Sequence, residues 1–256
     1  MGDELMKISL GIDQIAVREL VKAFTDSTNH VLNDIKTEHG LDTGNFRNGG
    51  AWDVRFKRIK EVGLNNELVV LTAKRGIWKF ICLLNLANGV LLVFSKEKNL
   101  ETVIKKLGKK SIHYFHALVS ITSDPFDLDR QQQELFPIFT EEYEARRLEE
   151  VLKILGEDYP KVKQVVFVVS QEVDRQVTGV EARLYNKYFE LVDVEDWSSY
   201  VSEDYSDIFV SNEQDNDSET KPIAKIKDSI KIRRDHLKPT IPKKTDDTKK
   251  EEDLNQ

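Results

Sequence analysis

Two apolar runs on either side of Ala87-Asn88-Gly89 dominate the middle of the chain. They cover residues 77–86 and 90–95, and an Asn-Gly pair between apolar runs is typical of a tight β-hairpin. Because both runs are almost continuously apolar, we expect strands that are buried on both faces. The pattern therefore predicts an antiparallel hairpin in a sheet that helices must cover.

Helical spacing or helix-capping residues mark other parts of the chain. Residues 12–35 carry apolar side chains about 3.6 positions apart, which predicts one long helix. Trp52, Phe56 and Ile59 share one face of a second helix, which ends near Gly63. Further helices are predicted at residues 99–107 with Asn99 as the cap, at 111–121, and at 140–155 with Thr140 as the cap.

β-rich runs complete the pattern. They predict strands at residues 68–73 and 162–170, and one or two more within 180–194. Asp124-Pro125 begins an irregular segment between them. We therefore predict an α+β fold, with a mainly antiparallel sheet of about five strands covered by helices.

The chain changes character after Trp197. Between Asp193 and Thr220 the sequence contains many acidic residues and no Lys or Arg. Residues 221–250 are then rich in Lys, Arg and Pro. Such polar segments cannot bury enough apolar surface to offset the entropy lost on ordering. We expect one globular domain over residues 1–202 and a disordered tail, acidic and then basic, over residues 203–256.

Composition and charge narrow the setting. The 256 residues carry a formal net charge of −7, which argues against coating nucleic acid by bulk charge. Cys82 is the single cysteine, so no intramolecular disulfide forms, in keeping with a reducing cytoplasm. The first residues lack the order of a signal peptide, and the longest apolar stretch, residues 80–94, is too short to span a membrane. We expect a cytoplasmic protein without a membrane partner.

His113 and His116 are the candidate catalytic residues. Three positions apart on a helix, their imidazoles share a face and could act as acid/base groups or bind one metal ion. A metal site needs a third ligand, and no HExxH or similar cluster supplies one, so we predict no metal. The alternative is that Tyr114 and Phe115 pack in the core while the histidines cap a helix or face solvent.

Two further catalytic patterns are poorly matched. Cys82 could pair with a histidine as a nucleophile, but its apolar strand should raise the thiol pKa and leave it inert. A common metal-nuclease core places an acid two residues before a lysine at a strand end. Thr72 stands at that position before Lys74, and Phe94 stands there before Lys96, so the pattern is absent at both places.

Basic residues near the second predicted helix form the candidate nucleic-acid surface. Gly49-Gly50 precede that helix, whose N-terminus could bind an anion, and Phe46 and Trp52 are candidate stacking groups. The alternative is a solvated helix face with Trp52 in the core. No phosphate-binding glycine motif occurs, so we predict no cofactor. The candidate nucleic-acid-binding residues are Arg47, Arg55, Arg58, Lys74 and Arg75.

Four short segments carry a family resemblance: Trp52-Asp53, Arg75-Gly76-x-Trp78, Lys96-Glu97-Lys98-Asn99-Leu100 and His113-Tyr114. Together they resemble an uncharacterised family of proteins from Gram-positive bacteria and their prophages, over about residues 10–195. The resemblance implies no activity. It implies a bacterial cytoplasmic setting and a mobile-element context.

These observations favour a non-enzymatic binding or regulatory protein. Its globular domain would engage one partner and its charged tail another, with a protein as the expected partner and nucleic acid as the alternative. Enzyme activity stays open, because the second hypothesis is a nuclease-like enzyme with basic side chains on phosphates and a histidine as acid/base. Histidines that converge with two acids in a cleft would favour the enzyme, whereas histidines that point apart or into the core would favour binding.

Overall fold

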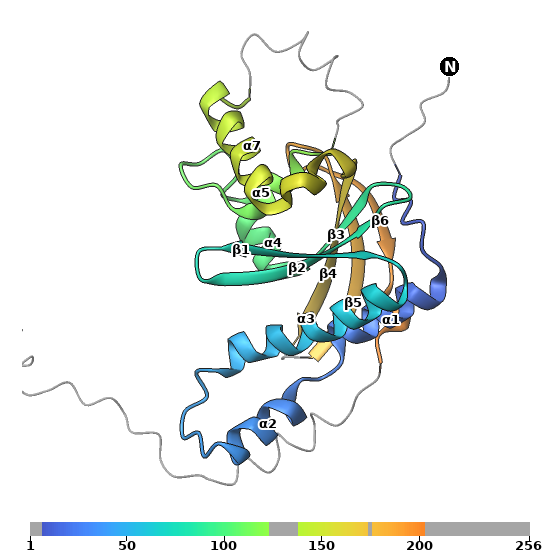
Figure 1. Cartoon of the computed structure of the whole chain (residues 1–256), viewed down its shortest axis with the longest axis vertical. Coiled ribbons are helices and arrows are strands. Elements are labelled where there is room, and N and C mark those ends of the chain that lie inside the picture. Colours follow the sequence, from blue (N-terminus) through green and yellow to red (C-terminus); the bar gives the residue numbers. More distant parts are fainter. Residues whose placement is uncertain (1–6, 123–137, 174–175, 203–256) are drawn as a thin grey trace, which may run out of the picture. The chain divides into compact units, whose positions relative to one another are not determined.

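The structure, a computed structural model, describes residues 7–122, 138–173 and 176–202 (Figure 1). All of them belong to one unit of the chain, Met1–Asp207. The tail predicted for residues 203–256 and the irregular segment that begins at Asp124 lie outside the described residues.

One mixed sheet organises the fold. Within the described residues it has six strands in the order β1-β2-β3-β4-β5-β6, and only β3 and β4 run parallel. The prediction of an α+β fold with a mainly antiparallel sheet is confirmed, with one strand more than expected. The strands are β1 (Val69–Arg75), β2 (Trp78–Asn85), β3 (Val90–Lys96), β4 (Gln164–Val173), β5 (Gln176–Tyr185) and β6 (Leu191–Asp196).

Helices cover both faces of the central pair of strands. Phe94 on β3 and Phe167 on β4 point to opposite faces, because Phe94 pairs with Val168 and Phe167 with Val93. The ring of Phe94 packs against Phe24 of α1 (Gln14–Thr25), with 5.4 Å between ring centroids. The ring of Phe167 packs against Phe115 of α5 (Tyr114–Val119), with 5.2 Å between centroids. Helices on both sides of the sheet therefore bury both faces of these strands, as the apolar runs predicted (Figure 1).

The long helix expected over residues 12–35 is two helices, α1 and α2 (Asn29–Glu38). The break falls at Asp26, which caps α1 in an extended conformation. Arg58 holds this break, because its guanidinium donates to the carbonyl oxygens of Asp26 and Ser27 at 2.9 and 3.1 Å. Helical spacing continues across the junction in the sequence, which is why the pattern alone predicts a single helix.

The helix α3 (Arg47–Asn65) begins earlier than expected. Gly49 and Gly50 therefore lie inside its first turns, and the expectation that they precede the helix is wrong. A Cβ atom on Gly50 would stand 2.9 Å from Leu32 Cδ2, so the missing side chain lets α2 and α3 approach closely.

The remaining helices follow the sheet. The helix α4 (Glu97–Ile104) continues directly from β3, so Asn99 lies inside it, and the cap predicted at Asn99 is instead Lys96. The helix α7 (Glu141–Leu155) begins as predicted, with the Thr140 hydroxyl accepting from the Tyr143 N–H. Two short 3-10 helices complete the fold, η1 (Gly156–Lys161) and η2 (Ser198–Tyr200).

Candidate ligand-binding pocket

A pocket opens where β2 separates from β3. The two strands pair over Cys82–Asn85 and Val90–Val93, with Cys82 opposite Val93. Beyond this point β2 continues to Trp78 paired with β1, while β3 continues to Lys96 paired with β4. The gap between the diverging strands lies at the carboxyl end of the parallel strand β3, a position where α/β sheets commonly bind ligands.

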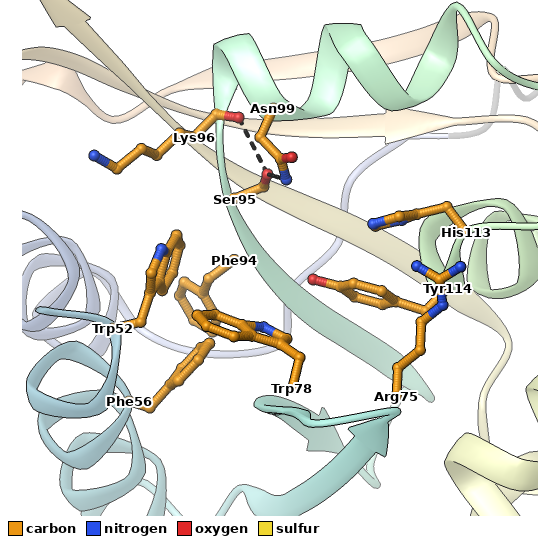
Figure 2. A pocket seen from close by; sticks show the side chains of 10 residues that line it. All are labelled: Trp52, Phe56, Arg75, Trp78, Phe94, Ser95, Lys96, Asn99, His113 and Tyr114. Atoms are coloured by element: carbon orange, nitrogen blue, oxygen red, sulfur yellow. Dashed lines mark hydrogen bonds between the residues drawn. The ribbon is translucent and has the colours of Figure 1, made fainter. Parts of the chain in front are cut away.

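The pocket has a volume of about 400 Å³. Its lining comes from α3, the β1–β2 hairpin, the junction of β3 and α4, and the start of α5 (Figure 2). The lining residues are Trp52, Phe56, Arg75, Trp78, Phe94, Ser95, Lys96, Asn99, His113 and Tyr114.

Aromatic rings form two opposing sides of the pocket. On one side Trp52 lies 5.1 Å from Phe56, between ring centroids, and Phe94 stands beside them. On the other side the Tyr114 ring stacks on buried Phe80 at 4.1 Å. Trp78 lies between these groups in Figure 2 and is 39% exposed. Phe56, Phe94 and Tyr114 are buried, so Trp78 presents the most exposed aromatic ring of the lining to a ligand.

Arg75 brings positive charge to the pocket. Its guanidinium donates to the Ile112 carbonyl oxygen at 2.7 Å, and it forms no ion pair among the described residues. Lys96 differs, because its ammonium group binds Glu172 at 2.7 Å. Arg55 lies behind the lining with its guanidinium over the Trp52 ring, 5.7 Å from the centroid. Arg75 is thus the cation in the lining whose charge is left for a ligand.

His113 is a hydrogen-bond donor at the pocket. Its Nδ1 accepts from the Phe115 N–H at 3.2 Å, which caps α5. Burial, and then the positive charge of Arg75, lower the His113 pKa to about 3, so the ring is neutral at pH 7. A neutral imidazole with an accepting Nδ1 carries its proton on Nε2. The His113 ring and the Tyr114 hydroxyl both point into the pocket (Figure 2).

His116 lies elsewhere. It is 1% exposed, and both of its ring nitrogens bind backbone groups: Nδ1 accepts from the His113 N–H at 3.2 Å, and Nε2 lies 2.8 Å from the Val103 carbonyl oxygen. Burial lowers the pKa of His116 as well. The two candidate histidines are neighbours on α5, but only His113 reaches the pocket.

The five candidate nucleic-acid residues separate in space. Arg75 lines the pocket, and Lys74 is exposed on the other face of the same strand. Arg55 is partly buried behind Trp52, and its Nε has no hydrogen-bond partner. Arg58 and Arg47 connect α3 to the preceding helices. Arg58 donates to the carbonyl oxygens at the α1–α2 break, and Arg47 donates to the side chain of Asn33 on α2.

Cys82 is fully buried at the point where the strands diverge. Desolvation raises its pKa to about 12, so the thiolate that a nucleophile requires is scarce at neutral pH. No candidate metal site made of three His, Cys, Asp or Glu side chains occurs in residues 7–122, 138–173 and 176–202. In the same ranges, no helix combines the length and apolar character needed to cross a membrane.

Several lining residues could not be identified from sequence motifs. Trp78, Phe94, Ser95 and Asn99 belong to no chemical motif, and the pocket forms only when four distant segments come together. One signal was in the sequence: each of the four segments that carry the family resemblance supplies at least one lining residue.

The fold defines a small α+β domain whose pocket is lined by aromatic and cationic side chains. The chain belongs to the family of unknown function DUF5986, whose model matches residues 9–243. Membership in an uncharacterised family is as the resemblance implied, although the match extends into the region that we expected it to omit. Comparisons with curated proteins and with solved structures gave no match. The Gram-positive and prophage origin stays a prediction.

Proposed function

We propose that this protein is a non-catalytic binding protein whose pocket receives a planar aromatic ligand with a negative charge. The observation that carries the proposal is the convergence of aromatic rings from four elements on a pocket that Arg75 also lines, and the charge of Arg75 has no acidic partner among the described residues. The volume of about 400 Å³ is within the range of small-molecule sites.

Different side chains of the pocket would bind the ring and the charged group of the ligand. Trp78, which is 39% exposed, offers a ring for stacking, which tolerates many planar rings. Arg75 offers N–H donors in a planar fork that suits carboxylate and phosphate groups. The Nε2–H of His113 adds a neutral donor from α5.

The same geometry favours binding over catalysis. A general acid or base works best with a pKa near the working pH, whereas the pKa of His113 is lowered to about 3. His116 is occupied by backbone groups in the core. In this proposal the protein works in the cytoplasm, where Cys82 stays reduced, and the charged region after residue 202 engages a protein partner.

Intrinsic fluorescence tests the proposal. In the full chain, Trp197→Phe leaves Trp52 and Trp78 as the only indoles, and both line the pocket. Titration with adenosine 5′-monophosphate or nicotinate should change the emission in a saturable way. Adenosine, which lacks the charge, should bind more weakly, and inorganic phosphate, which lacks the ring, should leave the emission unchanged.

Two substitutions locate the signal. Arg75→Gln should weaken binding of the charged probes, and Arg75→Lys should restore part of it, since it retains the positive charge. Lys36→Gln is the matched control, because Lys36 is exposed on α2 and outside the pocket. An emission that none of the ring-bearing probes changes would refute the proposal.

A further inference from the structure

The pocket is bordered by a positively charged surface. It combines Arg75 of the β1–β2 hairpin with residues 105–110 after α4, a segment that contains no acidic residue. None of its five cationic side chains forms an ion pair within the described part of the chain. We call it the basic rim: Arg75, Lys105, Lys106, Lys109 and Lys110.

Hydrogen bonds to neighbouring parts of the domain hold Arg75 and residues 105–110 in place. Arg75 donates to the Ile112 carbonyl oxygen at 2.7 Å, which ties the hairpin to the chain before α5. The 105–110 segment is itself fixed to α7, because Gly108 N–H donates to the Tyr143 hydroxyl and Arg146 to the Lys110 carbonyl oxygen, both at 3.0 Å. The rim is therefore a fixed surface of the folded domain.

The arrangement of charge in the rim is unfavourable without an anion. Four lysines fall within residues 105–110, and like charges so close together repel one another. Arg75 and Lys106 also act together on His113, since both lower its pKa after the larger effect of burial. Positive charge thus extends from Arg75 in the pocket to the 105–110 segment.

The extent of this charge indicates a polymer. A single anionic group on a small ligand is served by Arg75, whereas the four lysines of the rim lie outside the lining residues. A polyanion whose charges repeat along its length would place further groups on them. Exposed Trp78, directly opposite Arg75, provides a ring between the rim and the pocket.

The shape of the pocket decides between single and double strands. A pocket of about 400 Å³ lined by aromatic rings accepts one base with its sugar. In a duplex the bases are stacked and paired, whereas in a single strand they are free to stack on aromatic side chains. We infer that the pocket and the basic rim together bind single-stranded nucleic acid, with one base in the pocket and the phosphates along the rim. This inference rests on the proposed function of the pocket.

Fluorescence anisotropy with the full chain tests the inference. The probes are fluorescein-labelled 12-nucleotide single strands of DNA and of RNA and the matching DNA duplex, and adenosine 5′-monophosphate serves as an unlabelled competitor. A single strand should bind at least tenfold more tightly than the duplex and than the mononucleotide. Its affinity should fall as salt rises, because phosphate contacts release counterions.

Variants separate the rim from the pocket. Lys106→Gln with Lys109→Gln should weaken strand binding and reduce the salt slope by about 0.7 for each lost phosphate contact, while mononucleotide binding is unchanged. Trp78→Ala should weaken strand binding by roughly 5- to 150-fold, the range for a lost base stack. The matched control is Lys22→Gln with Lys36→Gln, which removes the same charge from exposed positions on α1 and α2. Any contribution from residues 221–250 is common to all variants.

The outcomes distinguish the inference from the proposed function. If the mononucleotide binds the pocket as tightly as the single strand and the rim variant changes nothing, the inference fails and the proposed function stands. If the duplex binds equally well and Trp78→Ala has no effect, the inference also fails. If neither the mononucleotide, nicotinate nor a strand changes the emission of Trp52 and Trp78, both fail.

Discussion

Arg75 and Trp78 lie directly opposite each other on β1 and β2, and both side chains line the pocket. Side chains of such a pair point to the same face, so the hairpin presents a cation and an indole together. This face is available because β2 has already separated from β3 at Cys82. The divergence of two strands therefore places the charge and the ring that the proposed ligand needs.

The first prediction concerns Cys82, at the base of that divergence. Cys82→Ser should lower the free energy of unfolding by about 1–3 kcal/mol, because a hydroxyl replaces a thiol in an apolar site. Cys82→Ala loses the sulfur without burying a hydroxyl and should cost less. Denaturant unfolding measures both variants.

Thiol labelling provides an independent check on Cys82. A buried thiol with a pKa raised to about 12 should react with an aromatic disulfide reagent at pH 8 only when the protein unfolds. Fast labelling of the native protein, with both variants as stable as the wild type, would show that this strand is exposed.

How much the sequence could predict depends on the range of the interactions. The β2–β3 hairpin follows from Asn88-Gly89 and its flanking apolar runs, all within a short window. The break between α1 and α2 depends on Arg58, more than thirty residues away, which binds the carbonyl oxygens at Asp26 and Ser27. The spacing of apolar residues within one segment cannot reveal a contact with a residue so distant in the sequence.

The pocket illustrates the same limit for function. Arg75 and His113 were candidates because their chemistry is visible in any sequence, and the structure places both at one site. Trp78 and Phe94 become lining residues only because β2 and β3 separate between them. Lys106 has a local explanation, as a cation at the end of a helix, which concealed its place beside the pocket.

The second prediction concerns pH. His113 and His116 both have a lowered pKa in the folded state, so the unfolded chain binds more protons below its ordinary histidine pKa of 6.5. Their stabilising contribution is therefore complete above pH 6.5 and is lost as the pH falls below it, for His113 down to about pH 3. The free energy of unfolding should decrease by about 1.4 kcal/mol per pH unit for each such histidine.

A variant isolates the share of His113. Asn accepts a hydrogen bond at a helix N-cap, so His113→Asn should keep the cap of α5. Because Asn does not titrate, the unfolded variant should bind one proton fewer as the pH falls. Between pH 5 and 6.5 its stability curve should be less steep than that of the wild type. Equal slopes in urea unfolding series would contradict a neutral, buried His113.

The third prediction compares two turns. Gly76 and Gly89 both have positive φ, at 59° and 77°, but only Gly89 is crowded: a Cβ atom there would stand 2.7 Å from the Lys161 carbonyl oxygen. Gly76→Ala should cost about 1–2 kcal/mol from the left-handed backbone alone. Gly89→Ala should cost more, because the turn must also move away from the segment before β4. Thermal unfolding that ranks the two variants in the opposite order would rule out this packing.

The pocket itself is tested most directly by NMR of the tryptophan indoles. The chain has three, of which Trp52 and Trp78 line the pocket, while Trp197 is buried outside it with its Nε1–H donated to Glu195 at 3.1 Å. In 15N-labelled full-length protein, a single-stranded 12-nucleotide probe should shift the Trp52 and Trp78 indole signals and leave that of Trp197 in place. Unchanged Trp52 and Trp78 signals at saturating probe, or a shift of Trp197 alone, would contradict the assignment of the pocket as the binding site.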